Sequence, residues 1–90
     1  MLTVRYSTKF KKDFKTCLKR RYHMDLLQQA IDILRIPDKL PLKNRDHDLS
    51  GDYVGHRECH LGPDWLLIYR QDGNDLLLYR TGTHADLFGR

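Results

Sequence analysis

The sequence has little of what marks several common classes of small protein. Its 90 residues include only two cysteines, Cys17 and Cys59, which do not form a CxxC pair, so a disulfide framework or a zinc knuckle is not expected. No run of 18 apolar residues occurs, and the amino end lacks the charged head and apolar stretch of a secretory signal. We therefore expect a cytoplasmic protein with reduced thiols and no membrane partner.

Several motifs of catalysis are missing as well. The chain contains no G-x-S-x-G, no G-x-x-x-x-G-K and no G-x-G-x-x-G, which disfavours serine hydrolases, P-loop enzymes and dinucleotide-binding enzymes. Cys59 stands beside His60, but neighbours on a strand point to opposite faces, so a Cys-His nucleophile pair is not expected. What remains is acid-base chemistry without a protein nucleophile.

Histidine, in contrast, is well represented in the second half of the chain. His47 stands between two aspartates, His60 precedes a Pro-Asp-Trp run, and His84 lies in a Thr-His-Ala-Asp run. An imidazole can both accept and donate a proton near neutral pH. With RNA as substrate, the 2′-hydroxyl is the nucleophile, and the protein need only move protons and stabilise the phosphate. His, Asp and Arg side chains suit that task.

Positive charge is concentrated near the amino end. Residues 1–35 carry nine Lys or Arg against three acids, whereas residues 36–90 carry seven against nine. Between Lys9 and Arg21 there are seven basic residues and one acid, Asp13. A solvated helix face would also be basic, but this density exceeds ordinary solubilising charge and favours contact with nucleic acid.

Hydrophobic periodicity predicts one α+β domain over residues 1–90, in the order β-α-α-β-β-β. We expect a strand at 2–6, a helix after the N-cap Ser7, a second helix at 24–35, a long loop at 36–52, and strands at 53–61, 65–71 and 75–81. Phe10, Phe14, Cys17 and Leu18 form the apolar stripe of the first helix. Short connections imply a small antiparallel sheet, and the helical hairpin must cover one of its faces.

A metal site is the less favoured interpretation of the strand at 53–61. His56, Glu58 and His60 share one face there, and His47 or His84 could complete a tetrahedral shell. Polar residues on an open strand face are common without a metal, and exposed or hydrogen-bonded histidines would give the same pattern. We expect no metal and no other cofactor.

Two segments carry a resemblance to a known family. HLGPDWLLIY at 60–69 and RTGTHADLFG at 80–89 strongly resemble the YafQ-like branch of the RelE/ParE toxin superfamily. Asp46–Gly51 and Gly55–Arg57 agree in kind, so the resemblance spans nearly the whole chain. It implies a RelE-like fold and a ribosome-dependent messenger-RNA endonuclease that cuts in the ribosomal A site without a metal, as the toxin of a type II toxin–antitoxin pair.

The resemblance also implies roles and partners. The roles are acid-base catalysis for His47, His60, Asp64 and His84, contact with the scissile phosphate for Arg80, and stacking on or orienting a base for Trp65 and Phe88. Four lysines of the basic helix would bind ribosomal RNA, namely Lys11, Lys12, Lys15 and Lys19. The expected partners are the 70S ribosome, mRNA and a cognate antitoxin, with a toxin that is monomeric alone and in a heterotetramer with the antitoxin.

Some alternatives stay open at the level of sequence. A ParE-type toxin that inhibits a protein such as gyrase, or an RNA-binding module without toxicity, would not need the histidines. Trp65 and Phe88 could instead be core residues. His56 is an additional imidazole, and Asp86 could either tune His84 or face water. Spacing does not decide which histidine is the base and which the acid.

Overall fold

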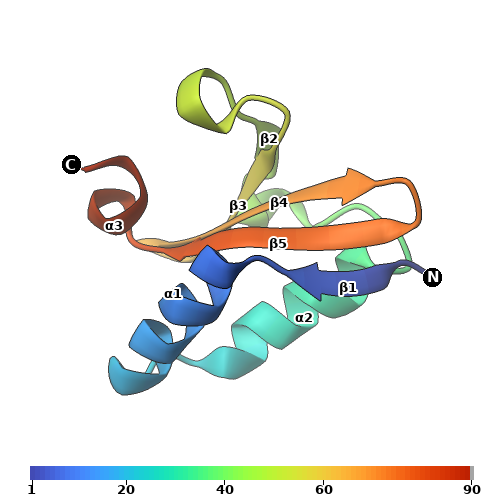
Figure 1. The fold of residues 1–90 in the computed structure, drawn as a ribbon. Coiled ribbons are helices and arrows are strands. Elements are labelled where there is room, and N and C mark those ends of the chain that lie inside the picture. The colour runs from blue at the N-terminus through green and yellow to red at the C-terminus, as the bar shows by residue number, and fades with distance from the viewer. Residues whose placement is uncertain (90) are drawn as a thin grey trace.

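The computed structural model describes residues 1–89 and confirms an α+β fold (Figure 1). Its elements are β1 (Thr3–Tyr6), α1 (Thr8–Lys19), α2 (Met24–Leu34), β2 (His47–Asp48), β3 (Arg57–Gly62), β4 (Trp65–Asp72), β5 (Asp75–Gly82) and α3 (His84–Phe88). Two short 3₁₀ turns, Leu42–Asn44 and Gly51–Tyr53, flank β2. The predicted order of one strand, two helices and three strands is confirmed, and β2 and α3 are additional elements.

The five strands form a single sheet in the order β1-β5-β4-β3-β2. β3, β4 and β5 make the predicted antiparallel meander, but β1 runs parallel to β5, with Thr3 opposite Asp75 and Tyr6 opposite Leu78. The prediction of a wholly antiparallel sheet is therefore wrong, and the sheet is mixed. A parallel neighbour requires a long crossover, which α1, α2 and the meander supply between β1 and β5.

The predicted strand at 53–61 begins later than expected. Residues Gly51–Tyr53 form a 3₁₀ turn, and Gly55 has a φ of +87°, which a strand does not tolerate. β3 therefore starts at Arg57. The predicted loop at 36–52 contains a short strand, β2, which pairs with β3 through His47 opposite Glu58.

The main core lies between the sheet and the α1–α2 hairpin. Ser7 caps α1 by accepting a hydrogen bond from the backbone N–H of Phe10 at 2.9 Å. The hairpin buries Phe10 and Cys17 from α1, and Leu27, Ala30, Ile31 and Leu34 from α2. Leu18, predicted to belong to this stripe, is 49% exposed, so the first helix packs through a narrower stripe than expected.

A second, smaller core forms on the opposite face of the sheet. Leu66 and Ile68 of β4 are fully buried there against Leu87 of α3, with Tyr53 and Tyr79 packed around them. In Figure 1 the hairpin lies below the sheet, the β2 segment above it, and α3 at one end. Within residues 1–89, no helix has the length and apolar character needed to cross a membrane.

Candidate active site

The centre of the candidate site is Glu58, a buried carboxylate on the sheet face opposite the hairpin. It is 4% exposed and lies on β3, two residues from His60 and directly opposite His47 of β2. Its Oε1 atom lies 3.4 Å from His60 Nε2 and 3.7 Å from His47 Nε2. Strand alternation therefore places Glu58 and His60 on one face, as predicted, and pairing of β2 with β3 adds His47.

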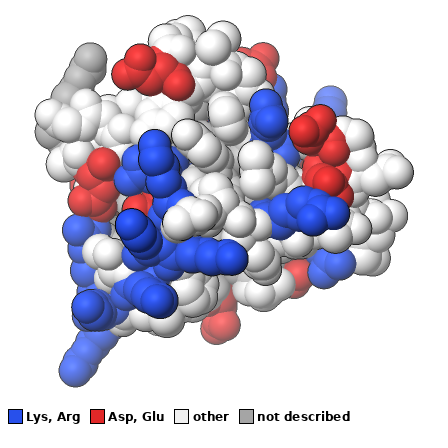
Figure 2. Space-filling model, in the orientation of Figure 1, with Lys and Arg blue, Asp and Glu red and all other residues white. Residues whose placement is uncertain are grey.

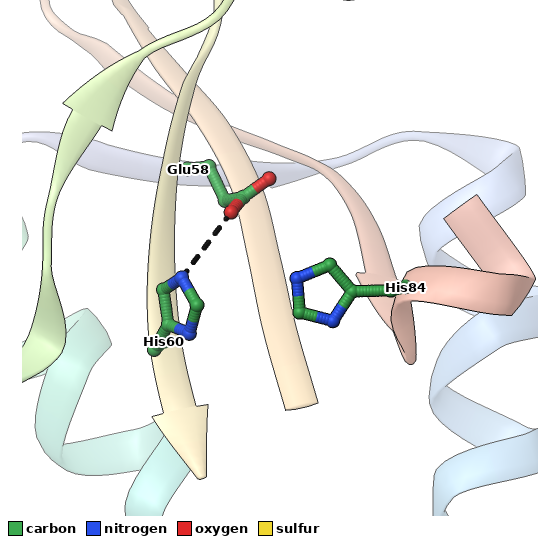
Figure 3. Close-up of side chains that lie close together, drawn as sticks. All are labelled: Glu58, His60 and His84. Carbon is green, nitrogen blue, oxygen red and sulfur yellow. Dashed lines mark ion pairs between the residues drawn. The ribbon is translucent and has the colours of Figure 1, made fainter. Parts of the chain in front are cut away.

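His84 enters the same site from α3. It is the first residue of that helix, and its ring centroid lies 5.8 Å from that of His60 (Figure 3). Asp64, in the turn between β3 and β4, accepts hydrogen bonds from His84 Nδ1 at 2.7 Å and from the His84 backbone N–H at 3.0 Å. These hydrogen bonds hold the pKa of Asp64 below its usual range, so Asp64 carries a negative charge beside the imidazole.

Two of the histidines have a defined tautomer in their neutral form. His84 Nδ1 faces a carboxylate, and His47 Nδ1 lies 2.7 Å from the carbonyl oxygen of Arg45. Because a carbonyl or carboxylate oxygen only accepts, each Nδ1 must carry the proton. The lone pair of the neutral ring is then on Nε2, which can accept a proton from a substrate.

His60 differs from the other two in its environment. Burial lowers its pKa below the ordinary value of 6.5, and the charge of Glu58 opposes this shift without cancelling it. His60 is therefore uncharged at neutral pH, which is the state a general base requires. Glu58 would stabilise the imidazolium that forms when His60 accepts a proton.

Three groups of the site could also hold a metal ion. Ligand atoms of Glu58, His60 and His84 lie within 4.8 Å of one another, and imidazole with carboxylate is a ligand set that suits zinc or copper. His56, which the less favoured metal interpretation of the sequence grouped with Glu58 and His60, is not a member of this group. Its ring instead packs on Tyr79, with centroids 4.6 Å apart.

Arg80 lies in the same cross-strand row as Glu58, with Ile68 between them. Two strand spacings correspond to about 10 Å. Its guanidinium is held by Asp13 of α1, with Nε 2.6 Å from Oδ2 and Nη2 3.2 Å from Oδ1. The sequence did not predict this pairing, which leaves Arg80 fixed in place and 20% exposed, with its charge balanced by Asp13.

The two aromatic predictions have different outcomes. Trp65 is 5% exposed, and its Nε1 donates to Thr81 Oγ1 at 2.8 Å within the main core. A ring this buried cannot stack on a base, so the stacking part of the prediction is wrong, while a role of Trp65 in orienting a base stays a prediction. Phe88 is 37% exposed and lies with its ring centroid 6.4 Å from that of His84, beside Tyr53. Its proposed role in stacking stays a prediction.

The basic helix presents its lysines to solvent. In Figure 2 the Lys and Arg side chains gather at the lower left, over the position of α1 in Figure 1. All four lysines expected to bind ribosomal RNA lie on α1 and are exposed, namely Lys11, Lys12, Lys15 and Lys19. The charge predicted from the sequence is therefore on one accessible surface.

The chain is similar to known proteins over nearly its whole length. The model of a family described as the bacterial toxin of a type II toxin–antitoxin system, YafQ, matches residues 2–89. The mRNA interferase toxin YafQ of Escherichia coli K12 is 42% identical over 88 residues, which are 96% of this chain and 95% of that protein.

This chain belongs to the YafQ toxin family. Two solved structures related to YafQ agree with its fold. The chain matches a structure of the Escherichia coli DinJ–YafQ complex with a TM-score of 0.89 and 39% identity, covering 99% of this chain and 100% of that one. It matches a metal-bound toxin from Helicobacter pylori with a TM-score of 0.91 and 41% identity, covering 98% and 100%. The resemblance to YafQ read from the sequence is thereby confirmed.

The sequence did not reveal two parts of this site. It indicated Glu58 only as a possible metal ligand, although strand alternation placed it beside His60. It also did not decide the role of Asp86. Asp86 pairs with Arg20 at the end of α1, with 2.6 Å between Oδ2 and Nη1. No local pattern signals a contact between residues 66 positions apart.

Proposed function

We propose that this YafQ family toxin is a ribosome-dependent endoribonuclease that cleaves mRNA in the A site and so stops translation. The observation that carries the proposal is the gathering of three imidazoles and two carboxylates on one face of the sheet, from β2, β3, α3 and the β3–β4 turn. The Escherichia coli relative named an mRNA interferase toxin supports the same activity.

The proposed reaction uses the 2′-hydroxyl of the substrate as nucleophile. His60 removes the 2′-proton, because its pKa is lowered and it is uncharged at neutral pH. The 2′-oxygen attacks the adjacent phosphorus, the bond to the 5′-oxygen breaks, and a protonated His84 gives its Nε2 proton to that oxygen. The products are a 2′,3′-cyclic phosphate and a 5′-hydroxyl. One proton is removed and one is donated, and the proposed reaction uses no metal, oxidant or reductant.

The carboxylates support these two proton transfers. Glu58 lies 3.4 Å from His60 and stabilises the imidazolium that His60 becomes. Asp64 holds His84 through Nδ1, which leaves Nε2 as the atom that faces the substrate. His47 Nε2 lies 3.7 Å from the same oxygen of Glu58, and we propose that His47 shares the proton with His60.

Binding groups surround this centre on the proposed route of the mRNA. Phe88, next to His84, would stack on a base exposed in the A site, and stacking on aromatics is how single-stranded RNA is commonly held. Arg80 would act as a fixed hydrogen-bond donor to the phosphate at the edge of the site, through guanidinium N–H groups that Asp13 does not accept. The four exposed lysines of α1 would bind ribosomal RNA.

We further propose that a cognate antitoxin is the cytoplasmic partner of this protein. Support comes from the DinJ–YafQ complex, which is a structure of a relative with a second protein. The chain would be monomeric alone and in a heterotetramer with its antitoxin. Light scattering of the toxin with and without the co-expressed antitoxin measures both states.

Pulse-labelling tests the proposed function in cells. Induction of the toxin without antitoxin should stop incorporation of labelled amino acid before incorporation of thymidine changes. Purified toxin should cut an mRNA only when ribosomes carry it, and the cuts should be unaffected by a chelator. Loss of DNA synthesis before protein synthesis would instead support the gyrase-directed alternative.

A further inference from the structure

The helix α3 carries His84 but has little structure of its own to hold it. It spans five residues, and Leu87 is its only buried residue. A helix of one to two turns is not stable in isolation, because nucleation costs more than so few hydrogen bonds return. The position of the His84 imidazole therefore depends on contacts that α3 makes with the rest of the molecule.

One of these contacts is a charged clamp between α1 and α3. Arg20, the residue that caps the carboxyl end of α1, donates from Nη1 to Asp86 Oδ2 at 2.6 Å and from Nη2 to Asp86 Oδ1 at 3.1 Å. This two-point pairing fixes orientation as well as distance. Arg20 also makes the largest contribution to holding the pKa of Asp86 well below its usual range.

Asp86 connects this clamp to the residue before His84. Its Oδ2 accepts the backbone N–H of Thr83 at 2.9 Å, and its own N–H donates to Thr83 Oγ1 at 3.1 Å, so the two residues form a capping box. Gly82 leaves room for the Asp86 carboxylate, because a Cβ at position 82 would lie 2.8 Å from Asp86 Oδ2. The first turn of α3, which presents His84, is thus tied to the end of α1.

We propose that Arg20 and Asp86 are positioning residues that keep the His84 imidazole against Asp64 and aimed at the substrate, an inference that rests on the proposed role of His84. Among the described residues, neither side chain forms a hydrogen bond or ion pair with His84, and both act through the backbone of α3. The pair is 38% and 30% exposed, and ion pairs this open contribute little to overall stability. A catalytic group displaced by about 1 Å can cost on the order of 10²-fold in rate.

Two variants separate positioning from charge. Arg20→Gln removes a positive charge and Asp86→Asn removes a negative one, so any effect on ribosome affinity should have opposite signs in the two proteins. Both variants break the same clamp. In ribosome-dependent cleavage we expect kcat to fall by about 10- to 100-fold in each, and the double variant should be no slower than the worse single variant.

A matched control is available at the other end of the molecule. Arg5 also pairs with an aspartate across elements, at 2.8 Å from Asp75, and Arg5→Gln makes the same charge change as Arg20→Gln. The Arg5→Gln variant should leave kcat unchanged. Arg20→Lys, which keeps the charge and can restore one hydrogen bond, should recover part of the lost kcat.

A spectroscopic readout tests the clamp without any cleavage assay. The ¹⁵N shifts of the His84 ring should show one neutral tautomer, protonated on Nδ1, in the unaltered protein, because Asp64 accepts that proton. In Arg20→Gln and Asp86→Asn the two nitrogen shifts should move toward an average of both tautomers. The melting temperature should change little in either variant.

The outcomes distinguish the inference from the function on which it rests. If His84→Ala abolishes cleavage but Arg20→Gln and Asp86→Asn keep the original kcat, or change only KM, the clamp does not position His84 and the inference fails. If His84→Ala cleaves normally, the proposed function fails. In that case the tautomer measurement still decides whether the clamp orders the ring.

Discussion

One oxygen of Asp64 accepts two hydrogen bonds from one residue, His84. The backbone N–H lies 3.0 Å from Oδ1 and the ring Nδ1 lies 2.7 Å from it. The first bond fixes the start of α3, and the second fixes the rotation and the tautomer of the ring. Asp64 is thus an orienting residue, and His84 Nε2 is the atom left to exchange a proton.

Loss of His60 or His84 should affect cleavage far more than loss of His56. His60→Ala and His84→Ala should each lower the cleavage rate on the order of 10²- to 10⁴-fold, which is the usual range for a general acid or base. His56→Ala serves as the matched control, because His56 packs on Tyr79 outside the site. Single-turnover cleavage on programmed ribosomes measures all three. A rate for His56→Ala as low as that for His60→Ala would contradict this assignment.

Glu58→Gln should move the acidic limb of the pH–rate profile to lower pH. The charge of Glu58 raises the pKa of His60 against the larger lowering by burial, so removing that charge lets the pKa fall further. A base with a lower pKa stays uncharged, and therefore competent, to a more acidic pH. The maximum rate should fall as well, because the imidazolium formed in the reaction loses its partner. A limb that moved to higher pH would exclude His60 as the base.

Trp65→Phe tests the corrected role of the tryptophan. The change leaves a buried Thr81 hydroxyl without its donor, and losses of this kind cost about 1–3 kcal/mol of unfolding free energy. Urea denaturation should show that loss, while kcat of the folded fraction stays near its original value. Phe88→Leu should give the reverse, with reduced cleavage and little change in stability. A selective loss of activity in Trp65→Phe would restore a substrate role for Trp65.

Reversal of charge on α1 should weaken ribosome binding without unfolding the protein. Changing Lys11, Lys12, Lys15 and Lys19 to Glu leaves the buried stripe of Phe10 and Cys17 intact. Each lost phosphate contact should reduce the slope of log affinity against log salt by about 0.7–0.9. Filter binding over a salt series measures the slope, and circular dichroism checks the fold. Affinity and slope equal to those of the original protein would remove α1 from the mechanism.

Much of the fold could be predicted because its signals are local. Ser7 as an N-cap, the apolar spacing of both helices, and the turn between β4 and β5 each depend on a few adjacent residues. The parallel placement of β1 could not be predicted. It depends on which edge strand of the meander lies beside β1 in the folded protein, and β1 and β5 are far apart in the sequence. The late start of β3 follows from the backbone of Gly55, whose positive φ has no periodic signature.

The candidate site also combines residues that local motifs indicate with contacts between distant parts of the chain. His47, His60, Asp64 and His84 were found from motifs, and the structure brings them together. The clamp between Arg20 and Asp86 and the pairing of Arg80 with Asp13 join distant parts of the chain, so only the packed structure reveals them. The stacking role of Trp65 was wrongly predicted because the sequence around a tryptophan at the start of a strand does not show whether its ring faces the core or a ligand.

The proposed mechanism requires that the substrate's own 2′-hydroxyl attacks the phosphate with the help of His60 and His84. Ribosomes programmed with an mRNA that carries one 2′-deoxy nucleotide at the cut site test it most directly. The toxin should bind these ribosomes normally but should not cleave the message, while the all-ribose message should be cut to a 2′,3′-cyclic phosphate and a 5′-hydroxyl. Continued cleavage at the deoxy position would contradict the proposed mechanism and favour attack by an activated water, with Glu58, His60 and His84 as ligands of a catalytic metal.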